Sequence, residues 1–410
     1  MLKGKRVVLA VCGGIAAYKM ATMASLLVKQ GAEVQVMMTQ NATNFITPIT
    51  FETLTGRKCL VDTFDRNFNF EVEHISVAKW ADLVLIAPAT ANVIGKMAHG
   101  IADDMLTTTL LACTCKKLLA PAMNTQMYYN PAVQENLKTL ERYGIELIQP
   151  TAGLLACGDI GVGKMAEPQD MLRYIQRELA FDKDLQDLRV LVTAGPTQEA
   201  IDPVRFISNH STGTMGYALA EICMLRGAQV TLVTGKTALQ PPPFVEVVPV
   251  TTAAQMYEAV TSRSGEQDII IKAAAVADFR PAQMATEKVK KQDGFGSLTL
   301  ERTQDILLSL GEQKPKGQFL CGFAMETQDL LEQARAKMER KHLDMIVANN
   351  LKEQGAGFGT TTNQVTLLWP KGEEKLACMG KLQVAEQIVD KIVALRQEGK
   401  KHLSGTGRIH

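Results

Sequence analysis

A cysteine among glycines is the residue of this chain best placed to do chemistry. Cys157 lies in the segment ACGDIGVGKM (156–165), together with Gly158, Gly161 and Gly163. A structural cysteine usually lies in an apolar run, whereas a glycine-rich loop is mobile and leaves a thiol accessible. The segment therefore favours a reactive thiol over a core residue.

Polar residues also follow two apolar runs of the first half. Thr90 and Asn92 lie in APATAN (87–92), and Asn124 ends PAMN (121–124). Either segment alone would be an ordinary helix cap or turn. Two such turns at the carboxyl edge of one sheet instead favour a binding site. His74, just before a predicted helix, is a further candidate, although a lone histidine is more often a surface or capped residue.

The second half offers several groups for binding an anion. The polar segment 193–216 follows a strand and precedes a helix, but it lacks the G-K-[ST] of a P-loop. KAAAVADF (272–279) ends a strand with small residues, against which a planar ring or sugar could pack. EKVKK (287–291) is basic, which usually means a solvated face. Lys337 and Lys341 share one face of a predicted helix, a costly arrangement unless an anion such as a triphosphate lies between them.

The elements that position these groups begin the same way twice. Residues 4–39 and 187–235 each predict a strand, a glycine turn, a helix and a second strand. Such a unit can place a phosphate-bearing ligand at the carboxyl edge of a parallel sheet. The acidic residue that grips the ribose in dinucleotide enzymes is replaced by Met38-Thr39 and by Thr234-Gly235. We therefore expect no NAD at either site, and a mononucleotide at the first.

Length and patterning predict two domains. The chain has 410 residues, of which 46% are hydrophobic, enough for two cores. Apolar runs alternate with helical patterns in both halves, which indicates parallel sheets covered on both faces. The predicted fold class is α/β, with two Rossmann-like doubly wound domains. We place the boundary in the charged stretch near Gln186, giving domains 1–186 and 187–410.

Composition excludes several classes of protein. The net charge of +1 recruits neither nucleic acid nor membrane. No apolar run is long enough to span a bilayer, and the N-terminus lacks a signal-peptide cleavage site. The eight cysteines form no C-x-x-C pairs, which argues against a disulfide framework or a zinc site. The sequence predicts a cytoplasmic protein.

The first half resembles a known family. GGIAAYK (13–19), HISVAKWAD (74–82), APATAN, PAMN and ACGD-x-G-x-G are similar, in order, to motifs of the flavin-dependent cysteine decarboxylases, a flavodoxin-like flavoprotein class of the HFCD type. The match is closest to the phosphopantothenoylcysteine decarboxylase half of bifunctional coenzyme A biosynthesis flavoproteins. One departure is Lys164, where the family usually has an arginine, since lysine keeps the charge but loses the planar fork.

This resemblance implies FMN and a set of roles. In the family, oxidation of the cysteine moiety of the substrate lets CO2 leave, and the product is then reduced back, which needs a proton donor. By position that donor is Cys157. Asn124 would hold the substrate carboxylate, and His74 would orient the substrate or assist its deprotonation. The implied FMN-binding residues are Gly13, Gly14, Ile15, Thr39, Ala87, Pro88, Ala89, Thr90 and Asn92.

The second half resembles phosphopantothenate–cysteine ligases, through ISNHSTG (207–213), AAVADF, EKVKK, GFAMET (322–327) and the lysine helix. The resemblance implies CTP as co-substrate, with Mg2+ held mainly by its phosphates. Lys288 would stabilise the transferring phosphoryl group, and Asn209 would position the acyl-cytidylate. Thr214 and Gln304 depart from the family's usual lysine and proline. The implied CTP-binding residues are Lys272, Ala273, Ala274, Asp278, Lys288, Gln304, Asp305, Ile306, Leu307, Phe323, Lys337 and Lys341.

Together the two resemblances imply two consecutive steps of coenzyme A biosynthesis. 4'-Phosphopantothenate would condense with cysteine, and the adduct would be decarboxylated to 4'-phosphopantetheine. They also imply a homo-oligomer with trimeric decarboxylase contacts and dimeric ligase contacts, compatible with a dodecamer. The alternative is a flavin-binding inhibitory subunit without catalysis. It is disfavoured because Cys157, Asn124 and His74 are all present and the tail is short and basic.

Overall fold

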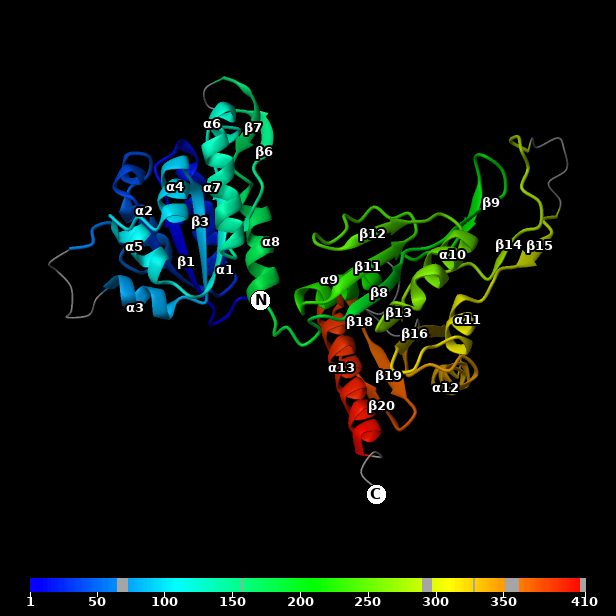
Figure 1. The fold of residues 1–410 in the computed structure, drawn as a ribbon. Helices are drawn as coiled ribbons and strands as arrows, with labels where there is room; N and C mark the ends of the chain where they lie inside the picture. The colour runs from blue at the N-terminus through cyan, green and yellow to red at the C-terminus, as the bar shows by residue number, and fades with distance from the viewer. Residues whose placement is uncertain (65–72, 156–157, 290–296, 327–328, 351–360, 406–410) are drawn as a thin grey trace. The chain divides into compact units, whose positions relative to one another are not determined.

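The chain folds into two compact units, residues 1–181 and 182–410 (Figure 1). The structure is a computed structural model that describes residues 1–64, 73–155, 158–289, 297–326, 329–350 and 361–405. Residues 182–186, expected in the first domain, pack instead with the second unit. There the Leu185 amide donates to the Arg226 carbonyl at 3.1 Å, so the charged stretch begins the second unit.

The first unit is built on a parallel sheet of five strands in the order β2-β1-β3-β4-β5. This is the flavodoxin-like order, as the sequence predicted. The strands are β1 (Arg6–Val11), β2 (Glu33–Met38), β3 (Leu83–Ala89), β4 (Lys116–Pro121) and β5 (Glu146–Leu147). Strands β1 to β4 each contain an apolar run of the sequence, because strands buried on both faces need apolar residues at successive positions. β5 is only two half-buried residues at the edge of the sheet.

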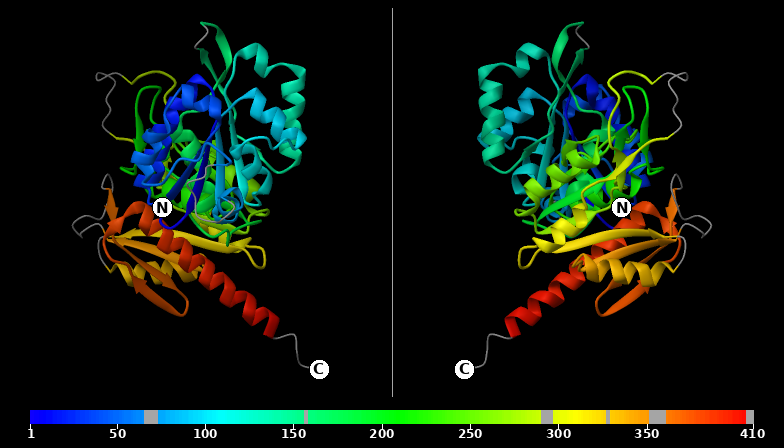
Figure 2. Two further views of the ribbon diagram at one scale, coloured as in Figure 1. Left: turned by 90° about the vertical axis from the view of Figure 1, so that its left-hand side faces the viewer. Right: turned by 90° about the vertical axis from the view of Figure 1, so that its right-hand side faces the viewer.

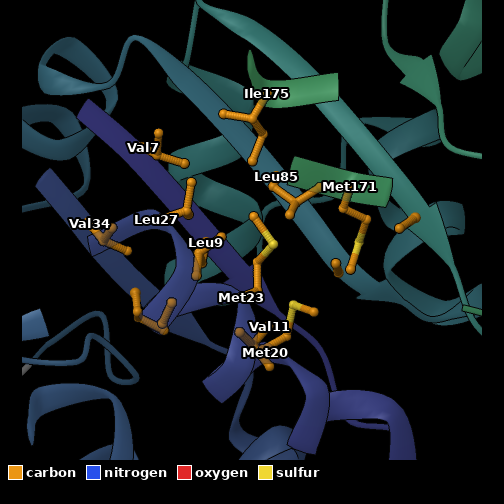
Figure 3. Close-up of a cluster of buried hydrophobic side chains, with 14 of the residues drawn as sticks. Val7, Leu9, Val11, Met20, Met23, Leu27, Val34, Leu85, Met171 and Ile175 are labelled. Carbon is orange, nitrogen blue, oxygen red and sulfur yellow. The ribbon is translucent and has the colours of Figure 1, made fainter. Parts of the chain in front are cut away.

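Alternate residues of β1 enter two separate cores. Val7, Leu9 and Val11 face α1 (Lys19–Lys29) and α8 (Pro168–Leu179), and Figure 3 shows them directed at Met and Leu side chains of α1. Val8 and Ala10 enter the core of the opposite face. That face is covered by α3 (Glu73–Trp80), α4 (Ala91–His99), α5 (Met105–Ala112) and α7 (Pro131–Arg142). The sheet is therefore covered on both sides, and its strand ends stay free for a site.

The second unit has a sheet of eight strands, ordered β12-β11-β8-β13-β16-β17-β19-β20. All neighbours from β12 to β17 are parallel, and the last two strands are antiparallel. The strands are β8 (Arg189–Ala194), β11 (Gln229–Thr234), β12 (Glu246–Pro249), β13 (Ile269–Lys272), β16 (Phe319–Glu326), β17 (Met345–Asn350), β19 (Val365–Trp369) and β20 (Gly372–Lys375). The doubly wound prediction is confirmed, with an antiparallel edge added.

In the part of this unit that the structure describes, five helices accompany the sheet: α9 (Thr214–Leu225), α10 (Ala253–Ser264), α11 (Ile306–Glu312), α12 (Leu330–Arg340) and α13 (Lys381–Gly405). A Cβ at Gly216 would lie 2.6 Å from Ala194 Cβ and 2.8 Å from the Thr193 carbonyl oxygen, so only glycine lets α9 pack this closely on β8. Helix α13, red in Figures 1 and 2, packs along α9 and beside the small β18–β21 pair (Thr362–Asn363 and Met379–Gly380).

Besides the β18–β21 pair, three antiparallel ribbons within the described residues were not predicted. They are β6–β7 (Thr151–Leu154 and Ile160–Lys164), β9–β10 (Gln198–Ala200 and Phe206–Ser208) and β14–β15 (Phe279–Pro281 and Leu300–Arg302). Their strands are short, and most of their residues are exposed or half-buried, so they carry no alternating apolar pattern. All three carry or adjoin segments that the sequence marked as functional.

Candidate active sites

Turns from neighbouring strands converge at the carboxyl edge of the first sheet. A Cβ at Gly13 would lie 2.7 Å from Asn41 Cβ, so the turn after β1 fits only a glycine against the turn after β2. At Gly14 a Cβ would lie 3.9 Å from Thr90 Cγ2, which belongs to the turn after β3. The two glycines therefore bring the predicted FMN-binding segments together.

Two threonines of this edge cap helices. Thr39 Oγ1 accepts from the Ala42 amide at 3.3 Å, and Thr90 Oγ1 accepts from the Val93 amide at 3.4 Å. Each begins a helical segment whose first N–H groups point toward the sheet edge, as an anion-binding site requires. Ala87, Pro88 and Ala89 are buried between them, whereas Ile15 and Asn92 are exposed.

Asn124 connects the PAMN turn to the ACGD motif. Its Oδ1 accepts from the Gln126 amide at 2.8 Å and so caps α6 (Thr125–Tyr128), while its Nδ2 donates to Asp159 Oδ2 at 2.9 Å. The Met123 amide also donates to the Gly163 carbonyl at 3.1 Å. A Cβ at Gly163 would collide with the Met123 carbonyl oxygen. The β6–β7 ribbon is thus fixed to the turn after β4 at both of its ends.

Lys164, which stands where the family usually has an arginine, makes an ion pair with Glu167. Its Nζ lies 3.5 Å from Glu167 Oε1, and the same carboxylate accepts from Lys19 Nζ at 2.8 Å. Lys19 belongs to the GGIAAYK motif, so Glu167 connects the glycine turn with the ribbon. The hydrogen bond from Lys19 is the main cause of a lowered pKa at Glu167, which keeps this carboxylate ionised.

Of the two remaining predicted decarboxylase residues, His74 and Cys157, the structure describes only His74. His74 is the second residue of α3 and is half-buried. Among the described residues, no hydrogen bond or ion pair joins it to the turns at 87–92 or 121–124. Cys157 lies outside the described residues, between β6 and β7 in sequence. Asp159, two residues after Cys157, accepts the hydrogen bond from Asn124 Nδ2.

The fit of this edge to a flavin mononucleotide can be judged from its donors. Glycine backbone at 13–14 and the capped N-termini after Thr39 and Thr90 supply N–H groups suited to one phosphate. Ala87 and Ala89 are fully buried in the two cores of the domain, so they hold the turn after β3 in place. The backbone donors of this edge fit the phosphate of the group.

At the carboxyl edge of the second sheet is a cavity of about 510 Å³. It contains eight of the twelve predicted CTP-binding residues and five that the sequence did not single out. The predicted ones are Lys272, Asp278, Gln304, Asp305, Ile306, Leu307, Lys337 and Lys341, and the others are Val276, Phe279, Arg302, Thr303 and Leu308. Four cationic and two acidic side chains give this wall the excess of positive charge that a triphosphate requires.

The lysines of the cavity differ in their surroundings. Lys341 Nζ lies 2.7 Å from Asp305 Oδ2, and Asp305 Oδ1 in turn caps α11 by accepting from the Leu308 amide at 3.1 Å. Burial alone would raise the pKa of Asp305, but the hydrogen bonds from Lys341 and the Leu308 amide, together with the charges of Lys341 and Lys272, outweigh it and the pKa is lowered. Lys272 makes no ion pair with a carboxylate within the described residues, although the charges of Asp305 and Asp278 act on it. Desolvation, followed by the charges of Lys337 and Lys341, lowers its pKa to about 8.

The small-residue segment after β13 is held by two buried threonines that the sequence did not reveal. The Ala274 amide donates to Thr193 Oγ1 at 3.1 Å, and the Ala277 amide donates to Thr197 Oγ1 at 3.0 Å. Both threonines are fully buried. Ala273 and Ala274 therefore shape the backbone beside the cavity. Phe323 contributes through its carbonyl oxygen, which accepts from Lys337 Nζ at 3.0 Å.

Asn209 and Lys288 have different placements. Asn209 Nδ2 donates to the Ala275 carbonyl at 3.0 Å, which joins the polar insert to the segment after β13. Lys288 is exposed and is not part of the cavity wall. Its neighbour Val289 accepts at its carbonyl from Arg205 Nη2 at 3.0 Å, so the basic segment is fixed to the β9–β10 ribbon.

A second cavity, of about 870 Å³, lies at the ends of β11 and β12. Its wall includes Tyr217, Lys236, Thr237 and Arg263. Thr237 Cγ2 would be 2.8 Å from a Cβ at Gly213, so this cavity borders the polar loop that precedes α9.

Comparison with known proteins agrees with both halves of this picture. Residues 1–180 match the Flavoprotein family, and residues 185–395 match the family described as DNA/pantothenate metabolism flavoprotein C-terminal domain. The coenzyme A biosynthesis bifunctional protein CoaBC of Bacillus subtilis is 49% identical over 406 residues, which cover 98% of this chain and 100% of that protein. The chain belongs to the CoaBC family. It is therefore a bifunctional enzyme of coenzyme A biosynthesis, with a decarboxylase and a ligase activity.

Other CoaBC proteins align over similar lengths. That of Escherichia coli is 41% identical over 400 residues, covering 97% of this chain and 98% of that one. Among solved structures, the C-terminal domain of a CoaBC protein is 42% identical, covers 53% of this chain and all of its own, and has a TM-score of 0.46. A PPC decarboxylase mutant complexed with pantothenoylaminoethenethiol is 32% identical over 42% of this chain and 96% of its own, with a TM-score of 0.38. No helix within the described ranges is both long and apolar enough to cross a membrane.

Proposed function

We propose that the second domain couples 4'-phosphopantothenate to cysteine with CTP, and that the first decarboxylates the adduct with FMN to give 4'-phosphopantetheine. The observation that carries this proposal is the cationic cavity of the second sheet, which combines lysines from β13 and α12 with the small-residue segment 273–277. The candidate FMN site at the carboxyl edge of the first sheet supports the decarboxylation step. The proposal rests on the match between these two sites and the two steps.

In the ligase step the charges of the cavity bind the triphosphate of CTP. Lys272, Lys337 and Lys341 neutralise its phosphates, and Asp305 holds Lys341 in place. The pantothenate carboxylate attacks the α-phosphate, pyrophosphate leaves, and the amine of cysteine then displaces CMP from the acyl-cytidylate. Mg2+ would be held mainly by the CTP phosphates, with Asp278 as a carboxylate of the same wall.

Positioning of the acyl group falls to Asn209, which is already bonded to the segment after β13. The larger cavity beside the polar loop offers room for the phosphopantothenate arm. Lys288 would stabilise charge on the transferring phosphoryl group. Because Lys288 is exposed outside the cavity, dimeric contacts through the exposed β9–β10 and β14–β15 ribbons would let it act in a second subunit.

In the decarboxylase step FMN, when bound, supplies the oxidation of the cysteine moiety and the later return of electrons. Asn124 holds the substrate carboxylate, and Asp159 fixes the orientation of its amide. Cys157 donates the proton that completes the product. His74 orients the substrate, and a trimer would let it serve a neighbouring subunit's flavin.

The test is a stepwise assay of the purified protein. With 4'-phosphopantothenate, cysteine and CTP, we expect pyrophosphate and CO2 in equal amounts and a flavin absorbance band in the protein. Cys157→Ser should keep the flavin and release CO2 but accumulate the unreduced ene-thiol. A colourless protein that cannot be reconstituted with FMN, or one that forms product without CTP, would refute the assignment.

A further inference from the structure

The turn that connects β9 with β10 holds a buried carboxylate. Asp202 lies in this turn and is 2% exposed. Its Oδ1 accepts from the amides of Val204 and Arg205, both at 2.8 Å. Its Oδ2 accepts from Arg205 Nε at 2.9 Å and also from Arg205 Nη2. Because several donors converge on both of its oxygens, the carboxylate is held in one orientation.

The same carboxylate contacts the basic segment EKVKK (287–291), of which the structure describes 287–289. The Val289 amide donates to Asp202 Oδ2 at 3.4 Å, across 87 positions of sequence. The Val289 carbonyl accepts from Arg205 Nη2 at 3.0 Å. Both polar backbone groups of Val289 are thus bound by one ion pair, and Val289 directly follows Lys288.

The segment depends on these contacts for its position. Residues 282–289 lie in neither a helix nor a strand. The Ala285 amide donates to the Ile201 carbonyl at 3.0 Å, so the segment is attached to the same turn at Ala285 and again at Val289. Consecutive Cα atoms are about 3.8 Å apart, and a backbone fixed on both sides of Lys288 leaves that residue few positions.

The charge that makes this anchor is permanent. The side-chain hydrogen bond from Arg205 is the main cause that holds the pKa of Asp202 well below its usual range, and the amides of Val204, Arg205 and Val289 act in the same direction. Burial opposes them but is outweighed. Asp202 is therefore ionised throughout the working pH range, and the anchor does not open by protonation.

We propose that Asp202 is a positioning residue for the ligation step, which places Lys288 by binding the backbone of Val289. This inference rests on the role proposed above for Lys288. A lysine on an unattached loop samples many positions, and few of them bring its ammonium group to a transferring phosphoryl group. The anchor removes the backbone part of that search before the substrates bind. Asp202 acts through Val289 and not on the reacting atoms.

The test is a double-mutant cycle on CTP-dependent ligation. Asp202→Asn keeps a side-chain oxygen for the amides of the turn but removes the charge that holds Arg205. We expect kcat to fall roughly tenfold to hundredfold. The Kd for CTP should not change, because Asp202 is not part of the wall of the cavity of about 510 Å³.

The decisive comparison is the double variant. If Asp202 acts through Lys288, Asp202→Asn should cause no further loss once Lys288→Gln is present. A purely structural role would instead multiply the two losses. A multiplied loss, or wild-type kcat in Asp202→Asn, would overturn the proposal.

Glu199→Gln is the matched control. Glu199 is a carboxylate of β9, 3% exposed, and it accepts from the Ala253 amide at 2.8 Å. It should keep wild-type kcat. If Glu199→Gln and Asp202→Asn lost kcat equally, the effect would belong to any buried charge of the ribbon, and the assignment to Asp202 would be wrong.

Hydrogen exchange of the wild-type protein tests the anchor without a variant. With fragmentation that resolves single amides, the Val289 amide should exchange at least about tenfold more slowly than an unprotected amide. Exchange at the unprotected rate would overturn the proposal. If Lys288→Gln ligated at the wild-type rate, the role of Lys288 and the inference would both fall, and slow exchange at Val289 would then show an anchor with no part in ligation.

Discussion

The side-chain amide of Asn124 donates to the carboxylate of Asp159 at 2.9 Å, across 35 positions of sequence. Asn124 ends the turn after β4, and Asp159 follows the candidate proton donor by two residues. The pair therefore sets the position of the Asn124 amide relative to the β6–β7 ribbon. Because Asn124 Oδ1 also caps α6, the two hydrogen bonds together fix the plane of the amide.

We expect Asp159→Ala to lower kcat/KM of decarboxylation about tenfold, because a hydrogen bond to a charged group contributes roughly 1.5–3 kcal/mol and this one is partly solvated. CTP-dependent ligation should be unchanged. The matched control is Gln149→Ala, which removes the 3.2 Å bond from Tyr128 on the same side of the domain and should leave both rates alone. Equal losses in the two variants would mean that general loosening, rather than the Asn124 contact, caused the effect.

The strands of both sheets could be predicted from the sequence. Runs such as 83–86 and 269–271 are apolar at successive positions, which parallel strands buried on both faces require. β20 was missed because GEEK (372–375) is a charged edge strand with no apolar face. The domain boundary was placed a few residues late because contact with Arg226, not composition, decides where Leu185 belongs.

Within the candidate sites, residues were predictable where their own chemistry signalled a role. Lys337 and Lys341 were predicted from like charges four apart, and both line the cavity of about 510 Å³ in the second domain. Thr193 and Thr197 were not, because their partners are backbone amides about 80 positions away, and every residue except proline carries such a donor.

Lys272 gives a pH-dependent prediction. Its pKa of about 8 means that the free enzyme loses this charge as the pH rises past that value, whereas bound triphosphate favours the ammonium form. We expect the Kd for CTP to rise above pH 8, by at most about tenfold per pH unit, with proton uptake on binding. Titration calorimetry in buffers of different ionisation enthalpy measures that uptake directly.

The control for this prediction is Lys272→Arg, which keeps a positive charge at every pH tested. It should flatten the pH dependence of CTP affinity between pH 7 and pH 9. The other charged groups that face Lys272 are Lys337, Lys341, Asp305 and Asp278. If Lys272→Arg retained the wild-type profile, one of these groups would have to carry the titration.

Lys288 tests the ligase assignment independently of the cavity. We expect Lys288→Gln to lower CTP-dependent ligation by about 10²–10³-fold, as removal of a group that stabilises transition-state charge does, and to leave decarboxylation of supplied adduct intact. Lys316→Gln, another exposed lysine of the same domain, is the matched control. Loss of both activities in Lys288→Gln would point to misfolding and remove support for the role.

Arg226 anchors the start of the second domain, and its removal should destabilise that domain. Its guanidinium, 7% exposed, donates through Nε to Asp184 Oδ1 at 2.8 Å and through Nη1 to Asp390 Oδ1 at 2.6 Å, so it joins the segment before β8 to α13. The hydrogen bonds and charges of both carboxylates outweigh its burial and raise its pKa further, so it stays charged throughout the working range. Arg226→Met leaves two carboxylates close together without a cation. Because Asp184 and Asp390 are 32% and 51% exposed, water can solvate them, and we expect a loss of about 2 kcal/mol rather than the larger cost of a fully buried pair.

Urea denaturation followed by far-UV circular dichroism should show this as an earlier transition, while flavin fluorescence of the first domain keeps its midpoint. Arg189→Met, which breaks an exposed pair with Glu266, should shift the same transition by less than about 0.5 kcal/mol. An equal effect of the two substitutions would show that the anchor at Arg226 adds nothing beyond an ordinary surface ion pair.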